Sequence, residues 1–334
     1  MRTLALPPTF AAMLRRRFVP GTQLDRPVFP DSIGGLRDPS NVRRDIRRAR
    51  GADALAWLTS HAFRKTTATV PDAAGHDLGM ALFTEVGDRW GQLHVTFGLG
   101  AHAEVVGDYD RAAELHRNGL RIAEELGLST EVSDNLAALG RIALLTGDHV
   151  QADELHESAR AQAVAQGYTI GEEFAELGLA LSARRQRRFD EAEALLRKWL
   201  VHDRRLESDL AVALIIAELG FVAELRGDAD AACALHREGL AAARKAGDPR
   251  AVALAFEGLA GAEALCGDHE RAARLLGAAA ALRERAGAPL PSGERGDVDR
   301  ITGAIRAAVG AEELTAAFER GRVHGESEVD VPAP

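Results

Sequence analysis

The sequence of 334 residues predicts an all-α solenoid made of five consecutive helical hairpins. Residue types recur at a fixed spacing of 40 positions along most of the chain. Aromatic residues make up only 5% of the chain while alanine and leucine are abundant, and this composition favours helices over sheets. Glycine-aspartate pairs stand where one helix would end and the next begin. Such internal repeats are typical of proteins in which each unit packs only on its neighbours.

Columns of matching residues define the repeat. Gly-Asp recurs at 107–108, 147–148, 227–228 and 267–268, and Arg187-Arg188 fills the remaining position. An alanine column holds Ala112, Ala152, Ala192, Ala232 and Ala272. One leucine column holds Leu115, Leu155, Leu195, Leu235 and Leu275, and another holds Leu99, Leu139, Leu179, Leu219 and Leu259. A second glycine column holds Gly127, Gly167, Gly247 and Gly287.

One unit shows how a hairpin forms. Residues 131–146 carry apolar residues at helical spacing, and Gly147 can adopt the left-handed conformation that ends a helix. Asp148 then caps the next helix, with Gln151 as its partner in a capping box, and Gly167 ends that helix. Because the alanine column is small, the two helices can approach closely. One hairpin cannot bury its apolar face alone, whereas five stacked hairpins can.

The repeats are flanked by segments of different charge and expected structure. Residues 1–71 contain 13 basic residues and 5 aspartates, a net charge of +8, whereas residues 72–334 carry a net charge of −17. We divide the chain into an N-terminal segment, a junction, the repeats, capping helices near 294–309 and 311–321, and a disordered tail. These parts cover, in order, residues 1–75, 76–84, 85–290, 291–322 and 323–334.

Composition also predicts the compartment. The two cysteines have no metal-type spacing, and the start "MRTLALPPTF" lacks a signal-peptide pattern, so we expect a cytoplasmic protein. The longest apolar run, residues 210–225, contains Glu218 and Glu224 and predicts no membrane contact. We expect Cys233 and Cys266 to be buried thiols. We predict no cofactor and no metal site.

Two resemblances refine this prediction, and the first covers the repeats. Leu139-Gly140 followed by Ala152 resembles the tetratricopeptide repeat, although the period is 40 rather than 34. The stretches "AFEGLAGAEALCGDHERAARLLGAAAALRERAGAPLP" and "ERGDVDRITGAIRAAVGAEELTAAFERGR" resemble the C-terminal helical-repeat region of large actinobacterial regulators of the AfsR/LuxR type, over about 82–322. The resemblance implies a non-enzymatic module that binds a protein or senses a signal in transcription regulation. No Walker A loop and no GxGxxG motif occur in the sequence.

The second resemblance covers residues 1–75. "AWLTSHAFRKTTATV" is similar to part of the catalytic domain of phage-type tyrosine recombinases, the enzymes of DNA integration, and implies phosphate-contacting roles for His61 and Arg64. The nucleophilic tyrosine is missing, because Tyr109 and Tyr168 both belong to the repeats. We therefore expect no enzyme. The alternative function is a defective recombinase fragment that retains weak DNA binding through residues 37–65.

The expected binding surface is the concave face lined by the first helix of each hairpin. Its charges and aromatic rings suit an extended peptide or a partner helix, although core packing is the alternative for several of them. These groove candidates are His94, Phe97, Glu104, Asp134, Arg141, Phe174, Arg184, Phe221, Glu224 and Glu257. We expect a protein or peptide partner in this groove, and a homodimer is a further hypothesis.

The third repeat departs from the others. Arg187 and Glu207 replace its two turn glycines, and Trp199 occupies a column of small residues. We expect a local distortion there and, as a hypothesis, a binding or dimer contact.

A histidine column also stands out, with leucine in the third and fifth repeats. Equivalent positions are displaced by a whole repeat, too far to share a metal ion, so we expect these histidines to pack inside. They are His116, His156 and His236.

Overall fold

The computed structural model describes residues 80, 83–85 and 87–324. The chain divides into two units, residues 1–73 and 74–334, and the description below concerns the second. His61, Arg64 and the basic stretch 37–65 lie outside the described residues. The regular elements of the described part are all helices and none is a strand, which confirms the predicted fold class.

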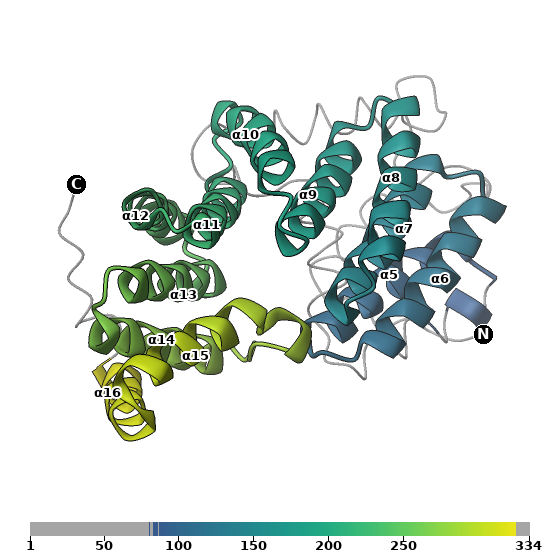
Figure 1. The fold of residues 1–334 in the computed structure, drawn as a ribbon. Coiled ribbons are helices and arrows are strands. Elements are labelled where there is room, and N and C mark those ends of the chain that lie inside the picture. Colours follow the sequence, from purple (N-terminus) through teal and green to yellow (C-terminus); the bar gives the residue numbers. More distant parts are fainter. Residues whose placement is uncertain (1–79, 81–82, 86, 325–334) are drawn as a thin grey trace, which may run out of the picture. The chain divides into compact units, whose positions relative to one another are not determined.

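Five helical hairpins follow one another, and their first helices begin 40 residues apart (Figure 1). The first helices are α5 (Arg89–Val105), α7 (Ser129–Thr146), α9 (Thr169–Arg185), α11 (Asp209–Arg226) and α13 (Pro249–Leu265). The second helices are α6 (Tyr109–Glu125), α8 (His149–Ala165), α10 (Phe189–Arg205), α12 (Ala229–Ala246) and α14 (His269–Arg285). Three shorter elements end the fold: η1 (Ser292–Glu294), α15 (Gly296–Val309) and α16 (Ala311–His324).

The turn between α7 and α8 shows how the Gly-Asp pair works. Gly147 has a φ of +89°, in the left-handed region that glycine adopts without steric cost. The Asp148 carboxylate accepts from the amide of Gln151 at 3.0 Å, as an N-cap should. The reciprocal half of the predicted capping box is wrong. The amide of Asp148 donates to the carbonyl of Ala143 at 2.9 Å and so closes the preceding helix instead.

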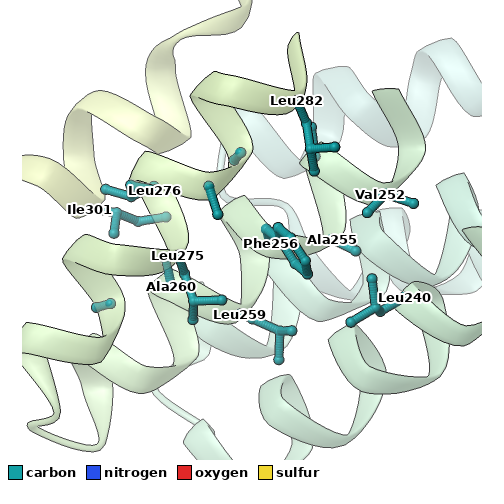
Figure 2. Close-up of a cluster of buried hydrophobic side chains, with 14 of the residues drawn as sticks. Leu240, Val252, Ala255, Phe256, Leu259, Ala260, Leu275, Leu276, Leu282 and Ile301 are labelled. Carbon is teal, nitrogen blue, oxygen red and sulfur yellow. The ribbon is translucent and has the colours of Figure 1, made fainter. Parts of the chain in front are cut away.

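The alanine column lies inside the hairpins. All five alanines are completely buried, as a small residue between two close helices must be. The largest apolar cluster lies at the C-terminal end, where Phe256 of α13 packs among leucines of α13 and α14, and Ile301 joins them from α15 (Figure 2). Tight backbone contact fixes α16 on α14, because a Cβ added at Gly277 or Gly321 would lie 2.0 Å from a carbonyl oxygen of the other helix. Helix α16 runs to His324, so two residues assigned to the tail are helical.

The histidine column packs inside, as predicted. The rings of His116, His156 and His236 are at most 1% exposed and lie against glycines of the first helices. A Cβ at Gly220 would come within 2.4 Å of the His236 ring, and one at Gly258 within 2.1 Å. Burial lowers the pKa of His156 to about 4 and that of His236 to about 3, so both rings are neutral at pH 7.

The third hairpin keeps the turn geometry of the others without their glycines. Arg187 and Glu207 have φ values of +62° and +54°, the only non-glycine residues of the described part in this region. Trp199 is 2% exposed, and its indole nitrogen donates to Glu176 at 2.8 Å. The backbone of α10 lies less closely against α9 and α11 than the other consecutive helices of the hairpins lie against each other. The indole packs among side chains of α9 and α11, and we infer that it acts as a spacer between these helices.

The two cysteines lie in different environments. Cys233 is buried, but Cys266 is exposed, so the prediction of a buried thiol is wrong for the second cysteine. The reason is its position at the end of α13, in the turn column whose other members are also exposed. Among the described residues, no helix is both long and apolar enough to cross a bilayer.

Candidate interaction site

The first helices of the hairpins meet a later stretch of the chain, the connecting segment of residues 286–300. It runs from the end of α14 through η1 and into the first residues of α15. The amide of Gly293 donates to the Tyr109 hydroxyl at 3.2 Å, and the Gly293 carbonyl accepts from Arg185 at 3.1 Å. Because Tyr109 begins α6 and Arg185 ends α9, the segment is anchored to the first and the third hairpin.

Five charged side chains on the first helices, named here the charged face, receive the connecting segment. They are Glu104, Arg141, Arg184, Glu218 and Glu224, from α5, α7, α9 and α11. Arg141 forms ion pairs with Glu104 and, at 2.7 Å, with Glu294. One guanidinium thus links two hairpins to the connecting segment.

Arg184 is the most buried cation of this network. Its side chain is 6% exposed and forms ion pairs with Glu218 at 2.7 Å and with Asp297 at 2.8 Å. The guanidinium also lies over the Phe221 ring, 5.1 Å from the ring centre. A buried charge is tolerated when it is paired, and here carboxylates from α11 and α15 supply the pairing.

The third link has the opposite polarity. Arg300 of α15 forms an ion pair with Glu224 of α11 at 2.6 Å and a second one with Asp297 at 3.1 Å. Glu294, Asp297 and Arg300 are three residues apart, a spacing that places side chains on one side of a helix. The two acids meet Arg141 and Arg184, and the base meets Glu224. Each charge of the segment therefore lies against an opposite charge of the charged face.

Burial and neighbouring charges shift the pKa values of the groups in this network. Burial disfavours the charged forms of both Arg184 and Asp297. The neighbouring carboxylates of Glu218 and Asp297 nevertheless raise the pKa of Arg184. The guanidinium groups of Arg184 and Arg300 hold the pKa of Asp297 below its usual value. Burial raises the pKa of Glu224, although Arg300 works in the opposite direction. Both partners of the Arg184 pair therefore stay charged at neutral pH.

Five of the groove candidates are paired with other side chains of this chain. They are Glu104, Arg141, Arg184, Glu224 and Glu257. Four of them belong to the charged face and are paired as described, because the connecting segment lies against them. Glu257 is 5% exposed and holds Arg283 of α14 through hydrogen bonds of 2.6 and 2.9 Å.

The remaining groove candidates, Phe221 aside, lie nearer the N-terminal ends of their helices. His94 stacks on Trp90 with ring centres 3.9 Å apart, and Phe97 meets the edge of the His116 ring. Burial raises the pKa of Asp134 to about 6, although its carboxylate accepts from the Tyr168 hydroxyl at 3.3 Å. Phe174 remains exposed, at 39%. Among the described residues, no hydrogen bond or ring contact joins one of these four residues to another.

Several residues of the site were missed at the sequence level. Glu218 and Arg185 lie on the first helices, and Glu294, Asp297 and Arg300 lie in the connecting segment. The charges of "GERGDVDR" could not identify the last three, because acids and bases three or four positions apart are also common on a solvated helix.

Comparison with known proteins yields structural matches. No protein-family model matches the chain, and no curated protein matches its sequence at a significant level. One matching solved structure is the crystal structure of BtubC (BKLC) from P. vanneervenii. It is 21% identical, the match covers 70% of this chain and 95% of that chain, and the TM-score is 0.49. The proposal below therefore rests on the geometry of the charged face.

Proposed function

We propose that the helical repeats form a non-enzymatic, cytoplasmic protein-interaction module, whose binding surface is the charged face and whose partner presents a charged helical segment. In this proposal the chain is related to the signal-receiving repeat region of large actinobacterial regulators of the AfsR/LuxR type. One observation supports it most directly. The charged face already holds a segment of acid, acid and base order through three ion pairs between different elements.

The connecting segment is a template for the partner. A ligand that offers carboxylates toward Arg141 and Arg184 and a cation toward Glu224 would satisfy the same groups. Such a ligand must compete with the connecting segment, because the two would use the same side chains. The apparent affinity is then reduced by the fraction of molecules in which the charged face is open.

A labelled peptide of residues 289–302 tests this function on the full chain. The variant Glu294→Gln/Asp297→Asn/Arg300→Gln weakens the connecting segment and should bind the peptide at least roughly tenfold more tightly than the unchanged chain. The matched control is Arg295→Gln/Asp299→Asn. It changes the charge of two residues in the same stretch that pair with each other at 3.0 Å, and it should leave peptide binding unchanged.

Fluorescence anisotropy distinguishes the outcomes. Adding Arg141→Leu and Arg184→Leu to the weakened variant should abolish peptide binding, provided that circular dichroism still reports a folded helical protein. Absence of binding to the weakened variant, or binding that survives loss of both arginines, would overturn the proposal.

A further inference from the structure

The third hairpin brings together three side chains of metal-ligand type. Glu173 projects from α9, and His202 and Asp203 are consecutive residues of α10. One ligand atom from each lies within 4.8 Å of the other two. Asp203 is 2% exposed, and its Oδ2 atom is buried and accepts no hydrogen bond from the described residues. A carboxylate in this position is costly without a cation or a donor.

The other repeats show what these positions normally contain. The column of Asp203 holds alanine in the first, second and fourth repeats, and these alanines are fully buried. The columns of His202 and Glu173 hold no acid, histidine or cysteine elsewhere. They contain Ile122, Gln162, Ala242 and Leu282 for His202, and Leu93, Ser133, Ala213 and Ala253 for Glu173. Only the third repeat fills all three positions with metal-ligand side chains.

Nearby cations do not neutralise the two carboxylates. In the described part of the chain, no lysine or arginine forms an ion pair with Glu173 or Asp203. Lys198 pairs with Glu172 and Glu176 at 2.8 and 2.6 Å, and Arg204 pairs with Glu238. The fifth repeat offers a contrast, because Arg283 takes the column of Asp203 and is itself paired with Glu257.

We propose that Glu173, His202 and Asp203 bind a divalent transition-metal ion, for which Zn²⁺ is the best fit. Imidazole nitrogen suits zinc and its neighbours, whereas Mg²⁺ and Ca²⁺ prefer an all-oxygen set. Carboxylate oxygens complete an accepted zinc ligand set, and three protein ligands leave one position for water or another donor. The His202 ring is oriented by edge contact with Trp199, with ring centres 5.2 Å apart.

The site has a structural consequence in this proposal. The ligands come from both helices of the hairpin in which the Trp199 indole separates α9 and α10. A metal ion would join these helices at the end of α10, where the backbone turns at Glu207 without a glycine. The ion thus stabilises the native hairpin by binding only the folded state.

Isothermal titration calorimetry of the full chain with Zn²⁺, after treatment with a chelator, tests the site. We expect one equivalent to bind, and Co²⁺ to give visible absorption of a low-symmetry nitrogen and oxygen site. Each of Glu173→Ala, His202→Ala and Asp203→Ala introduces a residue that at least one other repeat has in the same column. Each should weaken Zn²⁺ binding by roughly tenfold or more. The control His102→Ala removes an exposed histidine of α5 in the first hairpin and should leave Zn²⁺ binding unchanged.

The outcomes are distinct. In the alternative state Glu173 holds a proton and no metal binds, because burial and the neighbouring Asp203 raise the pKa of Glu173 to about 7. Absence of binding in the folded chain would support that state and overturn the proposal. Binding that is equal in the three alanine variants would assign the ion to surface groups and overturn it as well. If Asp203→Ala fails to fold, Asp203→Asn keeps the shape, and loss of Zn²⁺ binding in that variant supports the site.

Discussion

The third and fourth hairpins have the same backbone plan but different ways of filling it. The fourth turns at Gly227 and Gly247, whereas the third turns at Arg187 and Glu207 with the same sign of φ. The fourth places small Gly239 in the column where the third has buried Trp199. The comparison shows that the 40-residue frame is fixed by packing between neighbouring helices and not by any single turn residue.

A second difference concerns the histidine column, where two positions change together. In the first, second and fourth repeats a glycine 16 residues earlier makes room for the ring; these pairs are Gly100 with His116, Gly140 with His156, and Gly220 with His236. In the third and fifth repeats both members differ; these pairs are Ala180 with Leu196, and Ala260 with Leu276. Added volume on one helix is thus offset by a different side chain on the other.

Among the variants that test this comparison, Trp199→Ala should have the largest effect on the free energy of unfolding. It gives the third hairpin the residue that the second and fifth have in this column, Ala159 and Ala279. Loss of a buried indole should lower the free energy of unfolding by about 3–5 kcal/mol, because α9 and α11 cannot close the space completely. Urea denaturation measures the change. Val201→Ala, at an exposed position of the same helix, is the control and should change stability by less than about 0.5 kcal/mol.

A loss of less than about 1 kcal/mol in Trp199→Ala would mean that α10 moves inward to the spacing of its counterparts. The indole would then be a filler and not a spacer.

A double-mutant cycle at Gly220 and His236 tests the paired columns. Gly220→Ala alone should destabilise the chain by about 1–3 kcal/mol, because the new Cβ would overlap the imidazole. His236→Leu in the same chain recreates the pair Ala180 with Leu196 and should recover much of that loss. A coupling energy on the order of 1 kcal/mol or more is expected from thermal or urea unfolding. Strictly additive effects would show that the two columns do not compensate each other.

Local features of the repeats could be predicted from the sequence, and distant pairings could not. Gly147, Asp148 and the alanine column act on their neighbours, so a short window contains the information. Arg184 and Asp297 are 113 positions apart, and no period relates them. Their pairing depends on the path by which the connecting segment returns to the first helices. Cys266 was wrongly expected to be buried because residue type was used and its turn column was not.

The buried ring of His236 also gives a prediction for pH. The pKa of His236 is lowered to about 3 by burial, against an ordinary value near 6.5. Below pH 6.5 the ring of the unfolded chain takes up a proton, whereas the buried ring stays neutral. The free energy of unfolding therefore falls as the pH decreases from 6.5 toward the pKa of the folded chain. Between pH 6.5 and 5 the unchanged chain should therefore lose about 2 kcal/mol relative to His236→Leu. Urea unfolding of both proteins at several pH values measures the difference, in which the titration of all other groups cancels. Parallel pH profiles would show that the pKa of His236 is the same in the folded and the unfolded chain.

The smallest effect is expected from restoring the missing glycines of the third hairpin. Arg187→Gly and Glu207→Gly place glycine at φ values of +62° and +54°, which cost a side-chain-bearing residue roughly 1 kcal/mol each. Part of this gain is lost again, because glycine adds entropy to the unfolded chain. Arg187 also gives up its position 5.5 Å from the Phe189 ring, whereas Glu207 has no ion pair to lose among the described residues. Glu207→Gly should therefore stabilise the chain by a few tenths of a kcal/mol to about 1 kcal/mol, and more than Arg187→Gly. Differential scanning calorimetry resolves this order, and destabilisation by Glu207→Gly would mean that the third turn relies on its side chain.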